Sequence, residues 1–308
     1  MIVLEPSRDQ AQVLCAGEAQ EKAPRCPGVY RFFSDENVLL YVGKSIDIRT
    51  RLNSHFADAK QPGRHQKLMR AVRRVECELT AGETGALLVE NAAIKAETPL
   101  YNRRQRRSRK LWTQRLQEDA KGFLQVVPSD FCPAGRRLES VFGLFRSKHH
   151  LEDSLRSVAR EEGLCLRVLG FDRGRGPCFQ HQLGRCAGAC AGAETPAAHN
   201  QRLLECLETQ RIAAWPFPGP VILEEVRQER LHEQQPKRQF HVLDNWSYLG
   251  TFKRRDQALR KAQADNALNF DRDSYRIAFR AFRDDTCTIL DGATGDPLDN
   301  PFGPIPTP

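Results

Sequence analysis

The sequence predicts an α/β (α+β) protein built from several small domains, and three observations lead to this prediction. Residues 28–33, GVYRFF, and residues 38–44, VLLYVGK, are apolar segments rich in aromatic and β-branched side chains, and the polar residues 34–37 separate them. This pattern is typical of an antiparallel hairpin. Apolar residues then repeat at helical spacing, and four cysteines gather between residues 165 and 190.

The segment after the hairpin is expected to be a helix lying beside it. Ile48, Leu52 and Phe56 follow one another at intervals of four residues and form an apolar stripe. Arg51 and His55 are also four residues apart, on an adjoining face. The helix should therefore present an arginine and a histidine next to the two tyrosines of the hairpin.

The elements that follow complete a small domain. Residues 65–74 are expected to form a second helix, residues 75–81 a third strand, and the apolar pattern around Glu90 a third helix. These elements predict a mixed three-stranded sheet flanked by helices in residues 26–105. Residues 1–25 carry no firm pattern and are expected to be an N-terminal arm.

The remainder of the chain predicts two further domains. Ser147 is expected to cap a helix, and Asp244-Asn245 is expected to close a hairpin that a helix and further strands follow. The expected divisions are a basic linker with a four-cysteine domain at 106–195, a C-terminal α+β domain at 196–290, and a disordered tail at 291–308.

Positive charge is concentrated in the first part of the chain. The net charge is +8, and residues 1–115 hold 21 Lys and Arg against 13 Asp and Glu, whereas the remainder holds 26 of each. A polyanionic substrate favours such an excess, because neutralising phosphates releases counterions. The basic run at 103–115 is interpreted either as a contact to the DNA backbone or as a solvated linker.

The cysteines are expected to be reduced thiols. No apolar stretch approaches the ~20 residues of a membrane helix, and the first ten residues lack the apolar core of a secretory signal. We therefore expect a cytoplasmic protein without a membrane partner, in which the ten cysteines do not form a disulfide framework.

An ordered set of motifs resembles the GIY-YIG nuclease family and, within it, the repair excinucleases UvrC and its shorter homologue Cho. The segments GVY at 28–30 and YVG at 41–43 are followed by Lys44, Arg51, ETGALLVEN at 83–91 and Asn102. Either tripeptide alone would occur by chance. The resemblance implies a site made of Tyr30, Tyr41, Lys44, Arg51, His55, Glu90 and Asn102.

The chemistry of these residue types agrees with phosphodiester hydrolysis. Glu90 would supply a hard oxygen ligand for Mg2+ or Mn2+. Tyr41 is the candidate general base, and its ordinary pKa near ~10 requires nearby positive charge, for which Lys44 and the metal are candidates. Arg51 suits a phosphate.

The other site residues have supporting roles. Tyr30 would orient water or phosphate, and Asn102 would pin the site through its amide. His55 stands where UvrC-type sequences commonly carry tyrosine, and a histidine can donate to phosphate or relay a proton. Taken singly, Tyr30 and Tyr41 are better explained as strand aromatics, and Glu90, Lys44, Arg51 and Asn102 as solvated side chains. The nuclease site is favoured because one arrangement explains all of them.

Four cysteines, Cys165, Cys178, Cys186 and Cys190, are separated by gaps of twelve, seven and three residues. Thiolates select zinc or an iron-sulfur cluster, and zinc sites usually pair cysteines two to four residues apart at both ends. The resemblance to UvrC-type chains implies a [4Fe-4S] cluster. Zinc, or four buried thiols without a metal, are the alternatives.

The resemblance implies a DNA-repair endonuclease that cuts once, on the 3′ side of a lesion in damaged double-stranded DNA bound by UvrB. We expect no second nuclease half and no UvrC-type DNA-binding module. Two other functions stay open: a stand-alone structure-specific GIY-YIG endonuclease, and a non-catalytic DNA-binding module.

Overall fold

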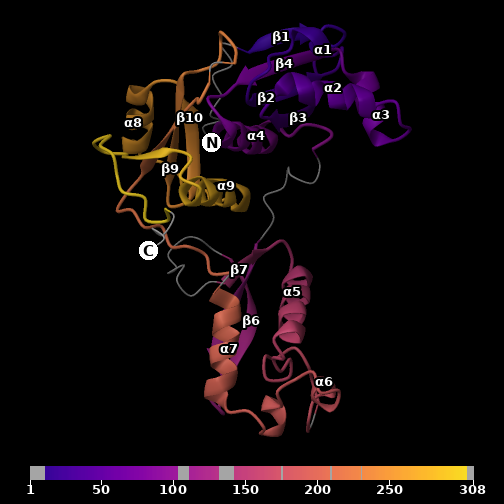
Figure 1. The fold of residues 1–308 in the computed structure, drawn as a ribbon, viewed down its shortest axis with the longest axis vertical. Coiled ribbons are helices and arrows are strands. Elements are labelled where there is room, and N and C mark those ends of the chain that lie inside the picture. Colours follow the sequence, from indigo (N-terminus) through magenta and orange to yellow (C-terminus); the bar gives the residue numbers. More distant parts are fainter. Residues whose placement is uncertain are drawn as a thin grey trace. The chain divides into compact units, whose positions relative to one another are not determined.

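The structure is a computed structural model that describes residues 11–102, 111–131, 142–174, 176–208, 210–229 and 231–303. It contains two compact units: unit 1 combines Met1–Ser108 with Pro216–Pro308, and unit 2 is Arg109–Trp215. Each unit combines antiparallel sheets with helices (Figure 1), which confirms the expected fold class.

The first sheet of unit 1 has four strands, where we expected three in a mixed arrangement. The order is β1-β4-β2-β3 and every pair is antiparallel. The strands are β1 (Gln12–Cys15), β2 (Gly28–Phe33), β3 (Leu39–Ser45) and β4 (Arg74–Leu79). The additional strand comes from the expected N-terminal arm. Leu14 and Ala19 are buried in the core of this domain, Ala19 on the short helix α1 (Ala19–Lys22), so residues 11–25 belong to it.

Two helices cover opposite faces of this sheet. On one face α2 (Ile48–Asp58) buries Ile48 and Leu52 against Phe32, and α3 (Arg64–Ala71) follows it. On the other face α4 (Glu83–Glu97) packs Val89 and Ile94 against the strands. The predicted stripe of α2 is confirmed at its two buried positions.

The C-terminal part of unit 1 is a second four-stranded antiparallel sheet of order β10-β9-β8-β11. Its strands are β8 (Val221–Val226), β9 (Arg238–Asp244), β10 (Ser247–Phe252) and β11 (Thr288–Asp291). Asn245 and Trp246 have φ of 44° and 64°, the left-handed geometry of a two-residue hairpin turn, so the expected hairpin is confirmed. Helix α8 (Arg255–Gln263) packs on this sheet.

Helix α9 (Arg272–Arg283) occupies a region where we expected strands. Its aromatic residues Tyr275, Phe279 and Phe282 all contact the fully buried ring of Trp246. The helix therefore forms because its aromatic stripe completes the core around one tryptophan.

Residues 291–303 are folded, although we expected a disordered tail from residue 291. The amide of Leu298 donates to Ile289 O at 2.9 Å, and Nδ2 of Asn300 donates to Phe282 O at 2.7 Å. Phe302 adds a ring contact with Trp246. The glycine and proline content suggested disorder, but these side chains have specific partners. Residues 304–308 lie outside the described part.

Unit 2 contains a three-stranded antiparallel sheet of order β6-β5-β7 with two long helices. Its elements are β5 (Trp112–Glu118), β6 (Leu124–Asp130), β7 (Phe142–Phe145), α5 (Lys148–Glu161), α6 (Phe179–Gln182), η2 (Ala189–Ala191) and α7 (Pro196–Glu208). Ser147 caps α5 as predicted, accepting from His150 N at 3.1 Å. Helix α7 buries Leu203 and Leu207 with Leu155 of α5, so it belongs to unit 2 and not to the C-terminal domain in which we expected it.

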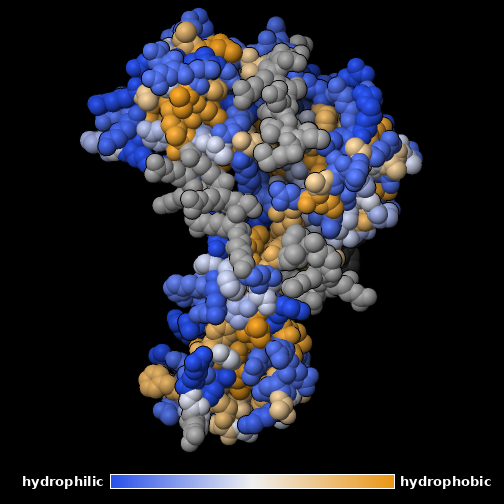
Figure 2. Space-filling view, turned by 180° about the vertical axis from the view of Figure 1, so that it is seen from behind, coloured by the Kyte–Doolittle hydropathy of each residue, from blue (hydrophilic) through white to orange (hydrophobic). Residues whose placement is uncertain are grey.

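The part of the surface seen in Figure 2 is mostly hydrophilic, with hydrophobic residues in separate patches. Within the described ranges no helix has both the length and the apolar character needed to span a membrane.

Candidate active site and cysteine group

The register of β2 and β3 brings the two tyrosines together. Tyr30 pairs with Gly43 and Phe32 pairs with Tyr41, so both tyrosines lie on the same face as diagonal neighbours. Their ring centroids are 6.1 Å apart. Gly43 is required for this arrangement, because a Cβ there would lie 2.8 Å from Cε1 of Tyr41 and would overlap the Tyr30 hydroxyl.

Helix α2 brings Arg51 and His55 to the tyrosine hydroxyls, as the sequence predicts. The hydroxyl of Tyr30 is 2.7 Å from Nε2 of His55, and both residues are buried. Arg51 is an exposed residue whose positive charge opposes the rise in pKa that burial gives to Tyr30 and Tyr41. Burial, with the charge of Arg51 beside it, lowers the pKa of His55 to about 3, so this imidazole is neutral at physiological pH.

The charges around Tyr41 differ from those we expected. Burial raises the pKa of Tyr41, the negative charge of Glu90 raises it further, and Arg51 opposes both effects. The ammonium of Lys44 lies elsewhere, 2.8 Å from Oε1 of Glu83. Arg51 is therefore the cation that favours the phenolate form of Tyr41, and Lys44 instead ties β3 to the first turn of α4.

Glu90 projects from α4 to the free edge of β3. Its Oε1 accepts the backbone amide of Lys44 at 3.0 Å. Burial raises the pKa of the Glu90 carboxyl, although the Lys44 amide and the positive charges of Lys44 and Arg51 lower it. Within the described ranges Glu90 makes no salt bridge. A half-buried carboxylate without an ion pair fits a ligand for a divalent cation.

Asn102 lies at the same edge of β3, beside Glu90. Its Oδ1 accepts Val42 N and its Nδ2 donates to Val42 O, both at 2.9 Å. The side chain thus pairs with β3 as another strand would, and it is 6 % exposed. Asn102 keeps the edge of β3 in place where it meets Glu90.

His65 also belongs to this network, and our sequence analysis missed it. Its ring stacks on His55 with centroids 5.0 Å apart, and its Nε2 is 3.3 Å from Nδ1 of His55. The pairing depends on the turn between α2 and α3, for which the sequence carries no periodic signal. The two histidines extend the network from Tyr30 to a partly exposed ring.

Most of the basic run that we considered as a DNA contact lies outside the described residues. The structure begins again at Leu111, and Arg115 is exposed on β5.

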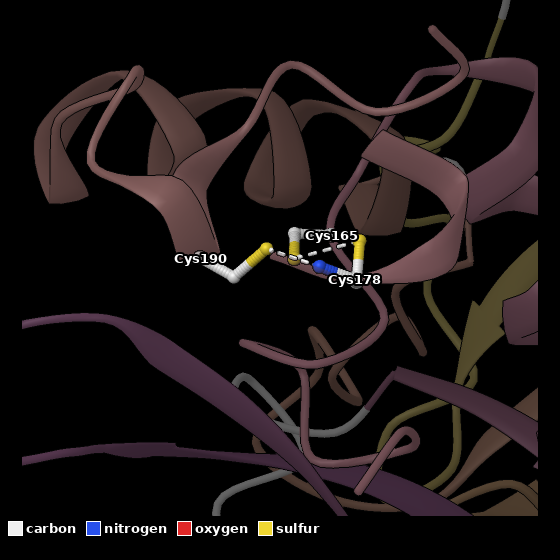
Figure 3. Close-up of side chains that lie close together, drawn as sticks. All are labelled: Cys165, Cys178 and Cys190. Carbon is white, nitrogen blue, oxygen red and sulfur yellow. Dashed lines mark hydrogen bonds between the residues drawn. The ribbon is translucent and has the colours of Figure 1, made fainter. Parts of the chain in front are cut away.

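Unit 2 brings three of the four predicted cysteines into one close group. The sulfur atoms of Cys165, Cys178 and Cys190 all lie within 4.8 Å of one another and turn toward a common point (Figure 3). Cys165 Sγ and Cys178 Sγ are 3.9 Å apart. Cys186 belongs to the same buried cluster, but its sulfur is not among the three that lie within 4.8 Å of one another.

The thiol environment fits a bound metal. Burial raises the pKa of Cys186 to about 12 and that of Cys190 to about 11. A cation bound here would therefore displace protons, which is the linkage expected of thiolate sites. Backbone amides also point at sulfur: Cys178 N donates to Cys190 Sγ at 3.2 Å and Gly188 N donates to Cys186 Sγ at 3.4 Å.

Three family models match successive parts of the chain. The model of the UvrC-like GIY-YIG domain matches residues 26–103, that of the UvrC/Cho excinuclease middle domain matches residues 122–209, and that of the excinuclease Cho C-terminal domain matches residues 220–295. The first match contains the tyrosine site and the second contains the four cysteines.

Individual proteins show the same likeness. The chain is 38 % identical over 260 residues to excinuclease cho of Salmonella typhi, covering 83 % of each chain. It is 36 % identical to excinuclease cho of Escherichia coli K12, over 82 % of this chain and 81 % of that one. The magnesium-bound GIY-YIG domain of Thermotoga maritima UvrC is 28 % identical over 28 % of this chain and 94 % of that one, with a TM-score of 0.26.

The match to the Cho proteins extends over most of both chains, and the three family models match successive parts of this one. The chain therefore belongs to the Cho family of UvrC-like GIY-YIG excinucleases, enzymes that hydrolyse phosphodiester bonds of DNA.

Proposed function

We propose that this enzyme makes a single incision on the 3′ side of a lesion in damaged double-stranded DNA to which UvrB has bound. The observation that carries the catalytic part is the convergence of Tyr30, Tyr41, Arg51 and Glu90 at one edge of a small sheet. The side of the incision and the role of UvrB rest on the relationship to the Cho excinucleases.

Each side chain of the site has a distinct task in this proposal. Arg51 binds the scissile phosphate and favours the phenolate form of Tyr41, which takes the proton of the attacking water. Tyr30 orients the attacking water or the phosphate through its hydroxyl, which is hydrogen-bonded to the neutral ring of His55. Asn102 and Lys44 keep β3 and α4 in register and do not touch the reacting atoms.

Glu90 would hold the divalent cation, Mg2+ or Mn2+. A bound cation would stabilise charge on the phosphate and the leaving oxygen. The structure supports Glu90 as its ligand because the carboxylate is half-buried, oriented by Lys44 N, and unpaired with any described ammonium or guanidinium group.

A duplex with one bulky lesion tests the proposal when each end of the damaged strand is labelled separately. The full chain with UvrB and Mg2+ should release one product, cut 3′ of the lesion, and omission of either UvrB or Mg2+ should abolish it. Equal nicking of undamaged DNA without UvrB would instead support the stand-alone endonuclease. A second cut on the 5′ side would reveal another active centre.

We further propose that Cys165, Cys178, Cys186 and Cys190 bind a [4Fe-4S] cluster. The support is the three sulfurs of Cys165, Cys178 and Cys190 within 4.8 Å of one another, the presence of Cys186 in the same buried cluster, the two amides directed at sulfur and the match to the UvrC/Cho middle domain. One observation favours zinc instead: the 3.9 Å between Cys165 Sγ and Cys178 Sγ is close to the edge, about 3.8 Å, of a tetrahedron with metal-sulfur bonds of about 2.3 Å.

Metal content distinguishes the two cofactors. Protein purified without oxygen should be brown and should contain iron and acid-labile sulfide in similar amounts. Stoichiometric zinc without iron would establish the alternative, and protein with neither metal that still folds would leave four structural thiols.

A further inference from the structure

Helix α4, which carries Glu90, begins without a cap of its own. Its N-cap residue is Gly82, which has no side chain to accept a hydrogen bond. The first amides of a helix have no partner within it, so they need an acceptor from elsewhere. Thr84 N donates to Oε1 of Glu225 and Gly85 N donates to Oε2, both at 2.9 Å. The acceptor lies on β8 of the C-terminal domain.

Glu225 is itself held in place by a buried network. Nε2 of His241 is 3.3 Å from its Oε2, and Nδ1 of His241 is 2.7 Å from the hydroxyl of Thr251. Tyr248 hydrogen-bonds to the same hydroxyl at 2.6 Å. Burial alone would raise the pKa of Glu225, but the hydrogen bonds from His241, Gly85 and Thr84 hold it below its ordinary value. An ionised carboxylate therefore faces the positive end of the α4 dipole.

The sequence of α4 is shaped to admit this carboxylate. A Cβ on Gly85 would lie 2.9 Å from Glu225 Oε2, 2.9 Å from His241 Cε1 and 3.1 Å from Gln239 Oε1. Glycine is a poor helix former, yet it occupies the first turn of α4. Its presence is explained by the three C-terminal side chains that fill the space a larger residue would need.

The C-terminal domain also binds α4 further along. Asn91 donates from Nδ2 to Oδ2 of Asp271 and, at 2.9 Å, to the hydroxyl of Ser274. Lys95 forms an ion pair with Asp271. Contacts on both sides of Glu90 in the sequence thus attach α4 to the C-terminal domain (Figure 1).

The first turn of α4 is linked directly to the site. Glu83 lies next to Thr84 and pairs with the ammonium of Lys44, and Lys44 N donates to Glu90. We propose that Glu225 is a positioning residue of the nuclease: the C-terminal domain caps α4 through this carboxylate and thereby sets the positions of Lys44 and Glu90. The inference rests on the proposed role of Glu90.

Glu225→Ala and Glu225→Gln in the full chain test this inference, with Glu224→Gln as the matched control. Glu224 is the adjacent carboxylate on β8 and pairs with Arg238 at 2.7 Å, away from α4. Glu225→Ala should lower kcat for nicking about tenfold to a hundredfold, because small displacements of catalytic groups are costly. KM for DNA should stay unchanged, and half-maximal activity should need more Mg2+.

The conservative variant and the control distinguish positioning from general loss of stability. Glu225→Gln keeps one acceptor oxygen, so its kcat should lie between those of Glu225→Ala and the parent. Glu224→Gln should leave kcat and the Mg2+ dependence as they are. If Glu225→Ala and Glu225→Gln had the same kcat and Mg2+ dependence as the control Glu224→Gln, the inference would be overturned.

Hydrogen exchange gives a readout that does not depend on nuclease activity. In Glu225→Ala the amides of Thr84 and Gly85 should exchange about tenfold faster, since each loses its acceptor. If these amides exchanged at the parent rate in Glu225→Ala while the parent enzyme nicked DNA, the capping role of Glu225 would be refuted and the proposed function would stand. If exchange accelerated in Glu225→Ala but the parent enzyme never nicked DNA, the capping role would be supported and the proposed function would be refuted.

Gly85→Ala tests whether a larger residue at this position raises or lowers the Tm. Alanine ordinarily stabilises a helix relative to glycine, but here we expect a lower Tm, because the new Cβ meets Glu225 and His241. In the Glu225→Ala background the same substitution should become less harmful. A higher Tm for Gly85→Ala alone would contradict the packing on which the inference depends.

Discussion

The nuclease region of unit 1 and the cysteine region of unit 2 position their reactive groups in different ways. Tyr30 and Tyr41 lie on paired strands, and Asn102 and Glu90 are hydrogen-bonded to the backbone of β3. The sulfurs of unit 2 come from residues 165–190, where the regular elements described are the short α6 and η2. A hydrophobic core lies beneath the tyrosines, whereas the thiols make up much of their own buried cluster.

This difference predicts a catalytic role for a metal in the nuclease region and a structural role for a metal in the cysteine region. The backbone of the nuclease site is held by its own hydrogen bonds, so the proposed cation would be needed for the reaction and not for the fold. The backbone hydrogen bonds of the cysteine segment mostly close short turns, such as Leu169 N to Cys165 O and His181 N to Cys178 O, and no sheet in the described part of the chain joins these turns. A metal that bound all the thiols would link the turns, so metal binding and folding should be coupled. Variants that remove one ligand from each region should therefore fail in different ways.

Glu90→Gln should have the largest effect. We expect nicking to fall about 10³-fold or more, because the amide removes the charged ligand of the cation. Thermal unfolding should change little, since the remaining oxygen still accepts Lys44 N. Glu36→Gln, an exposed change in the hairpin turn of the same domain, is the control. Near-normal nicking by Glu90→Gln in Mg2+ would refute the assigned ligand.

Cys178→Ser should unfold part of unit 2 and spare unit 1. Removing one thiolate weakens the metal site by several kcal/mol, given that structural sites contribute roughly 10 kcal/mol or more. Hydrogen exchange should accelerate around α6 and η2 while β2, β3 and β4 stay protected. Cys206→Ser on α7, outside the cysteine group, should leave metal content intact. If Cys178→Ser lost its metal and yet kept its protection, coupling between metal binding and folding would be excluded.

Tyr41→Phe should lower nicking about 10²-fold or more, the usual contribution of a general base, with stability nearly unchanged. The ring keeps its contacts with Tyr30 and Phe32, and only the proton acceptor is lost. Tyr101→Phe, to which we assign no role in the reaction, is the control. A Tyr41→Phe rate within a fewfold of the parent would transfer the role of base to another group, with His55 the next candidate.

Ser147→Ala should have the smallest effect, a loss of about 1 kcal/mol in the free energy of unfolding of unit 2, without a change in metal content. Ser147 satisfies the amide of His150 at the start of α5. Ser157→Ala on the exposed face of the same helix should cost less, because its hydroxyl bonds a side chain and caps nothing. Equal losses measured by denaturant titration would show that the cap is not the stabilising contact.

Short-range patterns predicted the parts of this protein whose partners are near in sequence. The hairpin of β2 and β3, the buried stripe of α2 and the cap at Ser147 each depend on residues within about one or two turns or on one tight turn. The motif order then placed Tyr30, Tyr41, Arg51 and Glu90 in one site, and their chemistry limited what that site does.

Tertiary structure decided the rest, because the partners are far apart in sequence or equivalent in type. Strand β1 joins the sheet through β4, and Lys44 takes Glu83 rather than facing the tyrosines. His65 reaches His55 through a turn between helices. Helix α4 is capped by Glu225, 141 residues beyond Thr84. Residue spacing alone carries no signal for such pairs, since many carboxylates could cap a helix and only the packed domains select one.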